Sequence, residues 1–90
     1  MQCIVIYDIP KTNIRQKVAD MCLDYGLTRI QCSAFMGELN ANRQGELFQK
    51  IKRKVGQNDA NVQVIPVCAR DMDQRKELRV NGYLLGQSVA

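Results

Sequence analysis

An uninterrupted apolar run near the start of the chain constrains the fold more than any other feature. It covers residues 3–7 and is followed by Asp8-Ile9-Pro10. A short apolar run bounded by a proline is typical of a strand buried on both faces, and so of a central strand. Pro10 has no N–H to offer a neighbouring strand, so the strand should end there. We therefore expect Asp8 at the carboxyl end of a central strand, where open α/β sheets tend to place their ligands.

The size and composition of the chain restrict the class of protein. Its 90 residues suffice for one domain with a modest core, and no apolar run is long enough to cross a membrane. Asp8 and Pro10 interrupt the first apolar run, so no signal peptide is visible and we expect a cytoplasmic protein. The chain has no histidine, which excludes His-based acid–base mechanisms. The four cysteines lack C-x-x-C spacing, which argues against a zinc finger and favours small core thiols; they are Cys3, Cys22, Cys32 and Cys68.

The positive charge is concentrated in the middle of the chain. The formal net charge is +4, and residues 43–69 carry five basic but only two acidic side chains. A basic stretch of this kind suits a polyanion, nucleic acid first. A solvated helix face explains it equally well on charge alone.

Hydrophobic periodicity predicts the order of the elements. Apolar positions at helical spacing predict helices over about 13–25, capped by Thr12 or Asn13 and ended by Gly26, and over about 41–56, between Asn40 and Gly56. Alternation over residues 28–39 predicts one strand kinked near Ser33 or two short strands. Residues 62–67 and 78–85 complete the predicted strands, while the charged stretch 69–77 should be irregular. The second helix should pack on the core through a single face, formed by Leu47, Phe48, Ile51 and Val55.

This order is that of an α+β ferredoxin-like plait, βαββαβ, with an antiparallel sheet and an added C-terminal strand. We expect one domain, with residues 1–68 as the core plait and 69–90 as a C-terminal segment that docks a dimer. Both helices should cover the same sheet face. The other, uncovered face would be apolar, which predicts a homodimer.

Three segments together resemble a known family. They are Tyr7-Asp8-Ile9, the helix start at residues 14–18, and the run 29–39, whose pattern Gln-x-Ser-x-Phe-x-Gly-x-Leu is the most specific. They look like the small CRISPR-associated spacer-acquisition proteins, also called CRISPR-associated endoribonucleases. The resemblance continues through residues 64–66 to Gly82-Tyr83 and departs at Cys32, where the family often has an aromatic residue.

The resemblance implies a fold, an activity and partners. The fold is a homodimer of ferredoxin-like subunits whose sheets face each other, with each C-terminal strand extending the partner's sheet. The activity is that of a divalent-metal-dependent nuclease acting on RNA or double-stranded DNA, dispensable in some members. The partner is the CRISPR integrase, for which the dimer is a central scaffold.

Asp8 is the candidate catalytic and metal-binding residue. Mg²⁺, or Mn²⁺ in its place, is usually held by one or two carboxylates with waters and substrate phosphate, and a two-fold axis could bring Asp8 of both subunits together. The alternative is an Asx-turn, in which Asp8 bonds nearby backbone N–H groups; residue type alone favours the turn, whereas the family motif favours catalysis. The Asp71-Met72-Asp73 segment resembles a metal-binding pattern but is interpreted as solvated surface.

The supporting residues have similar pairs of interpretations. Tyr7 and Phe35 either position a base or metal-bound water or belong to the core. Ser33 either donates to a phosphate oxygen or is an ordinary strand serine. The candidate phosphate contacts, otherwise plain solvated charges, are Arg15, Lys17, Arg29, Lys50, Arg53 and Lys54.

Five functions therefore compete. The leading one is a nucleic-acid-binding, metal-dependent endonuclease and integrase scaffold, and a non-catalytic duplex-binding scaffold is its alternative. A toxin-like endoribonuclease shares the fold. An RNA-recognition module is disfavoured because only 6% of residues are aromatic. A small-molecule regulatory plait lacks support from any Gly-rich phosphate loop.

Overall fold

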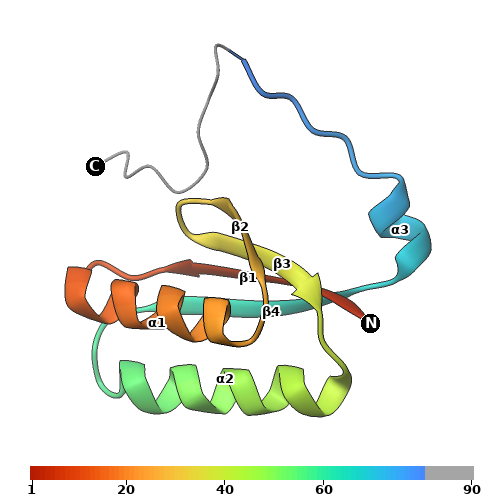
Figure 1. Cartoon of the computed structure of the whole chain (residues 1–90). Coiled ribbons are helices and arrows are strands. Elements are labelled where there is room, and N and C mark those ends of the chain that lie inside the picture. Colours follow the sequence, from red (N-terminus) through yellow and green to blue (C-terminus); the bar gives the residue numbers. More distant parts are fainter. Residues whose placement is uncertain (81–90) are drawn as a thin grey trace.

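The computed structural model describes residues 1–80 of the chain. Its elements follow the order β-α-β-β-α-β, with one further short helix (Figure 1). They are β1 (Gln2–Asp8), α1 (Thr12–Asp24), β2 (Thr28–Gln31), β3 (Ala34–Glu38), α2 (Ala41–Val55), β4 (Asn61–Val67) and α3 (Ala69–Asp73). The predicted α+β ferredoxin-like plait is thus confirmed.

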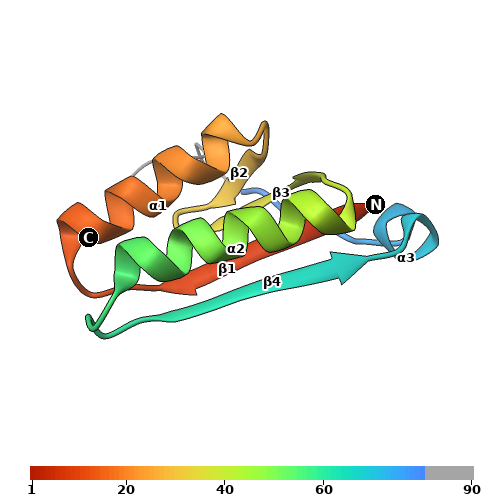
Figure 2. The same cartoon turned by 90° about the horizontal axis from the view of Figure 1, so that it is seen from below.

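The sheet has the strand order β2-β3-β1-β4, and all its paired strands are antiparallel. β1 is central, as predicted, but it is not buried on both faces. Cys3, Val5 and Tyr7 are buried, whereas the side chain of Ile6 is 43% exposed. The reason is that α1 and α2 both lie against one face of the sheet, as Figure 2 shows. We call the other face, which carries Ile6, the open face.

The core lies between the two helices and the sheet. Buried Leu47 and Ile51 of α2 pack there with residues of β1 and α1. Phe48 was predicted on the same helix face, but its side chain is 37% exposed. The stripe instead includes Gln44, which lies three residues before Leu47. Its side-chain amide donates to the carbonyl of Leu39 at 2.8 Å, which satisfies the buried polar group.

The helix ends agree with the sequence except at the start of α1. The predicted caps Thr12 and Asn13 are wrong: Lys11 is the N-cap, with no side-chain bond to the helix. The Asn40 side chain caps α2 by accepting from the Arg43 N–H at 2.8 Å. Gly26 ends α1 with φ +80, a conformation that costs glycine little; Gly56 ends α2.

The 28–39 segment forms two short strands joined by a turn at Cys32 and Ser33, so the split prediction is confirmed. Gly37 faces the helices, and a Cβ built there would lie 2.8 Å from Leu27 Cδ2 and 3.3 Å from Leu27 Cα. Phe35 and Leu39, two residues to either side, are buried on the same face. The Phe-x-Gly-x-Leu part of the motif is therefore a packing requirement.

The C-terminal part differs from expectation. Residues 69–73 form α3 instead of an irregular stretch, and the Cys68 Sγ caps it by accepting from the Asp71 N–H at 3.4 Å. Exposed Cys68 is thus no core thiol, unlike buried Cys3 and Cys22; Cys32 is half-buried.

The strand predicted over 78–85 is not seen in its first part, because residues 78–80 have no regular structure. The rest of that strand, with Gly82-Tyr83, lies outside the described residues. Within the part of the chain that the structure describes, no helix is long and apolar enough to cross a membrane.

Candidate functional site

Asp8 is the last residue of β1, and its side chain is exposed. Successive strand residues alternate between sheet faces. Asp8 therefore shares the open face with Ile4 and Ile6. Over residues 1–80, the Asp8 carboxylate has neither a hydrogen bond nor an ion pair, so the structure gives the Asx-turn alternative no support.

Apolar side chains of neighbouring strands lie next to Asp8 on the open face. Cross-strand register places Ile4 opposite both Met36 and Ile65. Ile6 and Ile65 are 43% and 40% exposed, while Ile4 and Met36 are half-buried. An uncovered apolar stripe therefore crosses the middle of the sheet, with the Asp8 carboxylate at the end of its central strand.

Tyr7 and Phe35 lie on the opposite face of the sheet, within the core. Their ring centroids are 6.3 Å apart and their planes nearly parallel, and both side chains are buried. The Tyr7 hydroxyl is buried without a hydrogen-bond partner in the described residues. Burial raises the pKa of Tyr7, and the positive charge of the nearby Arg29 guanidinium opposes this rise. The two aromatic side chains therefore belong to the core and point away from the face of Asp8.

Ser33 connects the β2–β3 turn to the strand that carries Asp8. Its carbonyl accepts the Tyr7 N–H at 3.0 Å. The turn is therefore held at the Asp8 end of the sheet, and the Ser33 side chain is half-buried there.

Three of the predicted phosphate contacts already have partners within the chain: Arg15, Arg29 and Lys50, the last of which pairs with Glu46 and Tyr25. The Arg15 guanidinium donates to the carbonyls of Ile9 at 2.9 Å and Pro10 at 3.2 Å, and to the Thr12 hydroxyl at 3.2 Å. Arg15 thereby holds the loop after Asp8. These hydrogen bonds explain why a cation lies in the first turn of α1, where the helix dipole disfavours it. The Arg29 guanidinium carbon lies 5.0 Å from the centre of the Phe35 ring.

The predicted cations on the helices other than Arg15 are exposed: Lys17 on α1, and Lys50, Arg53 and Lys54 on α2. Sequence reasoning missed a cluster around Tyr25, the C-cap residue of α1. The Arg43 guanidinium and the Lys50 ammonium lie 4.6 and 5.1 Å from the centre of its ring. The seven-residue spacing of Arg43 and Lys50, which places both on one flank of a helix, is the signal that could have found it.

Glu46 completes the Tyr25 cluster. The Tyr25 hydroxyl donates to the Glu46 carboxylate, whose oxygen also lies 3.9 Å from Lys50 Nζ. The hydroxyl lowers the pKa of Glu46, so this carboxylate stays ionised.

The end of the molecule where β1 finishes gathers the charged groups. α1 begins there and α2 ends there, as Figure 1 shows, and Lys11 Nζ on one side reaches Asn58 Oδ1 on the other at 3.4 Å. The last turn of α2 contains Lys52, Arg53 and Lys54. Basic residues and the Asp8 carboxylate thus share one end of the plait.

No group of three or more His, Cys, Asp or Glu side chains suited to a metal occurs within residues 1–80, Asp71 and Asp73 included. Among residues 1–80, Asp8 therefore does not belong to such a cluster. An exposed carboxylate without competing bonds fits an ion that takes one or two carboxylates, waters and substrate phosphate.

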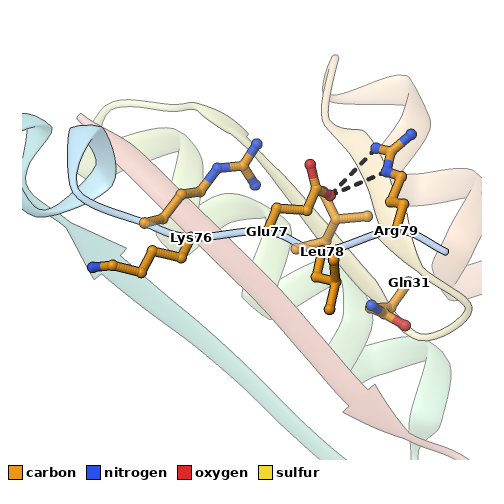
Figure 3. A pocket seen from close by; sticks show the side chains of 7 residues that line it. Gln31, Lys76, Glu77, Leu78 and Arg79 are labelled. Carbon is orange, nitrogen blue, oxygen red and sulfur yellow. Dashed lines mark hydrogen bonds and ion pairs between the residues drawn. The ribbon is translucent and has the colours of Figure 1, made fainter.

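A shallow cavity lies away from these groups. It is lined by Ile30 and Gln31 of β2 and by residues 75–79, with Arg79 paired to Glu77 at 3.3 Å (Figure 3). The Arg75 guanidinium also approaches the Met36 sulfur at 3.7 Å. The segment after α3 therefore runs beside the β2–β3 edge of the sheet.

Comparisons with known proteins place this fold and motif set in a family. Residues 1–75 match the family model described as CRISPR associated protein Cas2. The CRISPR-associated endoribonuclease Cas2 2 of Chloroflexus aurantiacus is 51% identical over 78 residues, which cover 87% of this chain and 92% of that protein. A CRISPR-associated endonuclease Cas1/endonuclease Cas2 fusion from Thermoproteus tenax is 40% identical over 73 residues, which cover 81% of this chain and 28% of the fusion.

A solved structure agrees. The crystal structure of Streptococcus pyogenes Cas2 matches with a TM-score of 0.75, covering 88% of this chain and all of that chain; at 18% identity it supports the fold alone. The family model covers most of the described chain, and the Chloroflexus relative matches almost end to end. The chain therefore belongs to the Cas2 family of CRISPR-associated proteins.

Proposed function

We propose that the chain acts in CRISPR spacer acquisition in the cytoplasm, as a homodimeric endonuclease that depends on Mg²⁺ or Mn²⁺. The observation that carries this proposal is the position of Asp8. Its exposed carboxylate, without bonds in the described residues, lies at the end of the central strand on an uncovered apolar sheet face. Pairing two open faces about a two-fold axis would bury the apolar stripe and could bring two Asp8 side chains together.

Each part of the site has a role in this proposal. Asp8 from both subunits would hold the cation, which supplies charge neutralisation at the scissile phosphate and an acidified water. Arg15 holds the loop that follows Asp8 through the Ile9 and Pro10 carbonyls. The stacked pair Tyr7 and Phe35 fixes β1 against β3 behind the carboxylate. The exposed cations of α1 and α2 would attract the nucleic acid.

The relatives support the choice of substrate and partner. The Chloroflexus relative is named an endoribonuclease, which makes single-stranded RNA the first substrate to test, with duplex DNA second. The Thermoproteus relative joins Cas1 and Cas2 in one chain, which supports Cas1 integrase as a partner.

A cleavage assay tests the proposal. Single-stranded RNA and duplex DNA would be incubated with the wild type, Asp8→Asn and Asp20→Asn, each with Mg²⁺, Mn²⁺ or a chelator. Asp20 is an exposed carboxylate on α1 and provides the matched control. We expect metal-dependent cleavage by the wild type and by Asp20→Asn, and none by Asp8→Asn. Cleavage that survives in Asp8→Asn with unchanged metal dependence would refute the role of Asp8.

The exposed cations at one end of the plait favour a second candidate, a non-catalytic duplex-binding scaffold for the integrase. Salt-sensitive duplex binding by the wild type and Asp8→Asn alike, without cleavage by either, would establish it in place of the nuclease.

A further inference from the structure

We propose that the seam between α1 and α2 is a binding track for the phosphate backbone of a nucleic acid. The track consists of Arg43, Lys50 and Lys54 on α2 and Lys17 on α1. We call it the seam track. It rests on the proposed function only in that the ligand is a nucleic acid, and it does not require cleavage.

Helix geometry places the three cations of α2 in one row. Positions 43, 50 and 54 are seven and four residues apart, so their directions agree within about 40° and the row extends about 16 Å. Leu47 and Ile51, between them, face the core. Lys52 projects on the opposite flank, about 180° from Arg43.

Contacts with Tyr25 show which way the row faces. Tyr25 is the C-cap residue of α1 and is only 8% exposed. The Arg43 guanidinium carbon lies 4.6 Å and the Lys50 ammonium nitrogen 5.1 Å from the centre of its ring. Such cation–π contacts orient both side chains toward α1. Cations already held in place lose less conformational freedom when they bind a ligand.

Lys17 continues the row on the other helix. Lys17, Met21 and Tyr25 recur every four residues, so Lys17 lies on the flank of α1 that carries Tyr25. The two helices run in opposite directions along the same face of the sheet, as Figures 1 and 2 show. Lys17 is therefore near the last turn of α2, where Lys54 lies. The seam track thus leads to the end of the molecule where β1 finishes at Asp8.

Helix stability explains these charges only in part, since Lys54 lies in the last turn of α2, where the helix dipole favours a cation. Arg43 lies in the first turn of α2, where a cation opposes the helix dipole. Lys50 and Lys54 are like charges four residues apart, which is mildly destabilising. Glu46 is the one acidic residue of α2, and its carboxylate is engaged by the Tyr25 hydroxyl and by Lys50. A net positive surface remains, and an anionic ligand would offset the cost.

The spacing of the row suits a nucleic-acid backbone. Phosphates of one duplex strand rise by 3.4 Å or so each along the duplex axis and lie farther apart along the winding backbone, so a row of about 16 Å spans at most about five of them. The four cations of the track supply positive charge and hydrogen-bond donors, which match phosphate oxygens. The track should therefore bind backbone without sequence preference, with a strong salt dependence.

Binding measured in the presence of a chelator tests the track separately from cleavage. Fluorescence anisotropy would give the affinity of the full chain for a labelled DNA duplex and for a labelled single-stranded RNA over a range of salt concentrations. For Arg43→Gln/Lys50→Gln we expect the slope of log affinity against log salt to weaken by about 1.4 to 1.8, with a loss of roughly 25- to 60-fold in affinity near 0.1 M salt. Lys54→Gln, which removes no contact among residues 1–80, should weaken the slope by about 0.7 to 0.9.

Control variants separate the track from diffuse charge and from misfolding. Arg70→Gln/Lys76→Gln lowers the net charge equally but alters exposed residues that lie on neither α1 nor α2, and it should leave the slope nearly unchanged. Arg43→Lys/Lys50→Arg keeps the charges and should retain wild-type binding.

The possible results are distinct. The track is overturned if the slope of log affinity against log salt weakens equally in both double glutamine variants. It is also overturned if Arg43→Gln/Lys50→Gln leaves this slope unchanged with both probes. Wild-type binding with the expected slopes but without cleavage in Mg²⁺ or Mn²⁺ refutes the nuclease and supports the track. Absence of wild-type binding to both probes refutes both.

Discussion

Replacing Gly37 by alanine should destabilise the protein through one local clash. The added Cβ would lie 2.8 Å from Leu27 Cδ2 and 3.3 Å from Leu27 Cα. The Leu27 side chain could rotate, but it is 4% exposed and its Cα belongs to the backbone, so space must come from the core or from separating β3 from the residues before β2. Overpacking of this kind costs about 1–3 kcal/mol. In a domain of this size a loss of about 2 kcal/mol lowers Tm by roughly 8–16 °C.

Urea and thermal unfolding, followed by circular dichroism, would measure this loss, with Gly45→Ala as the control. Gly45 lies inside α2 with nothing within 4 Å of an added Cβ, so the same substitution should stabilise by about 0.5–1 kcal/mol. All variants must be compared at one protein concentration, because the proposed dimerisation would make Tm concentration-dependent. A Gly37→Ala protein within about 0.5 kcal/mol of the wild type would refute the packing explanation of the motif.

Three further outcomes follow from other parts of the structure. Burial raises the pKa of Cys22 to about 12 from a usual 9.0, so the stability that this thiol contributes below pH 9 should be lost as the pH rises toward 12. In urea unfolding, the free energy of unfolding should fall by at most about 1.4 kcal/mol per pH unit because of this thiol, and Cys22→Ala should not show this fall. Tyr25→Phe should raise the pKa of Glu46 toward its usual value, since the hydroxyl that lowers it is gone, and NMR titration of the Glu46 carboxyl would measure this rise. An unchanged pKa would show that the hydrogen bond does not form. Ile6→Asp puts a charge on the open face and should convert the proposed homodimer to monomer in sedimentation velocity, whereas Leu23→Asp, at an exposed position of α1, should not. Dissociation by both variants, or by neither, would argue against the open face as the interface.

Much of the fold follows from local sequence, because each element there has an unambiguous pattern. The helix stop at Gly26 and the cap at Asn40 appear where glycine and asparagine predict them. The alternation of residues 28–39 gave the strands but left their division open, since a turn at Cys32 and Ser33 contains neither Gly nor Pro. The continuous apolar run of β1 indicated two buried faces; one of them is covered by helices, while the other is apolar and uncovered in the single chain.

The errors have tertiary causes. Thr12 was a reasonable cap by residue type, but the Arg15 guanidinium fixes the start of α1 by holding the preceding carbonyls. Phe48 fits the apolar pattern of α2, yet Gln44 takes the core position because its amide finds the Leu39 carbonyl. Cation–π contacts between Tyr25 and the basic face of α2 depend on how two helices meet, which local periodicity does not specify.

The candidate site shows the same division. The exposure of Asp8 follows from its place at a strand end, and the sequence locates it. The orientation of Tyr7 and Phe35 toward the core follows from strand alternation once the helix-covered face is known. Whether a second Asp8 completes the site is a property of two chains.

A mixed dimer would test most directly the proposal that Asp8 works as a pair. Wild-type and Asp8→Asn chains with different affinity tags would be co-expressed, the heterodimer purified through both tags, and its single-turnover cleavage of RNA measured beside both homodimers. If two Asp8 carboxylates hold one cation, the heterodimer should lose most of the wild-type rate and resemble the Asp8→Asn homodimer. A heterodimer that keeps half of the wild-type rate would show that each Asp8 acts alone, and would contradict the paired site.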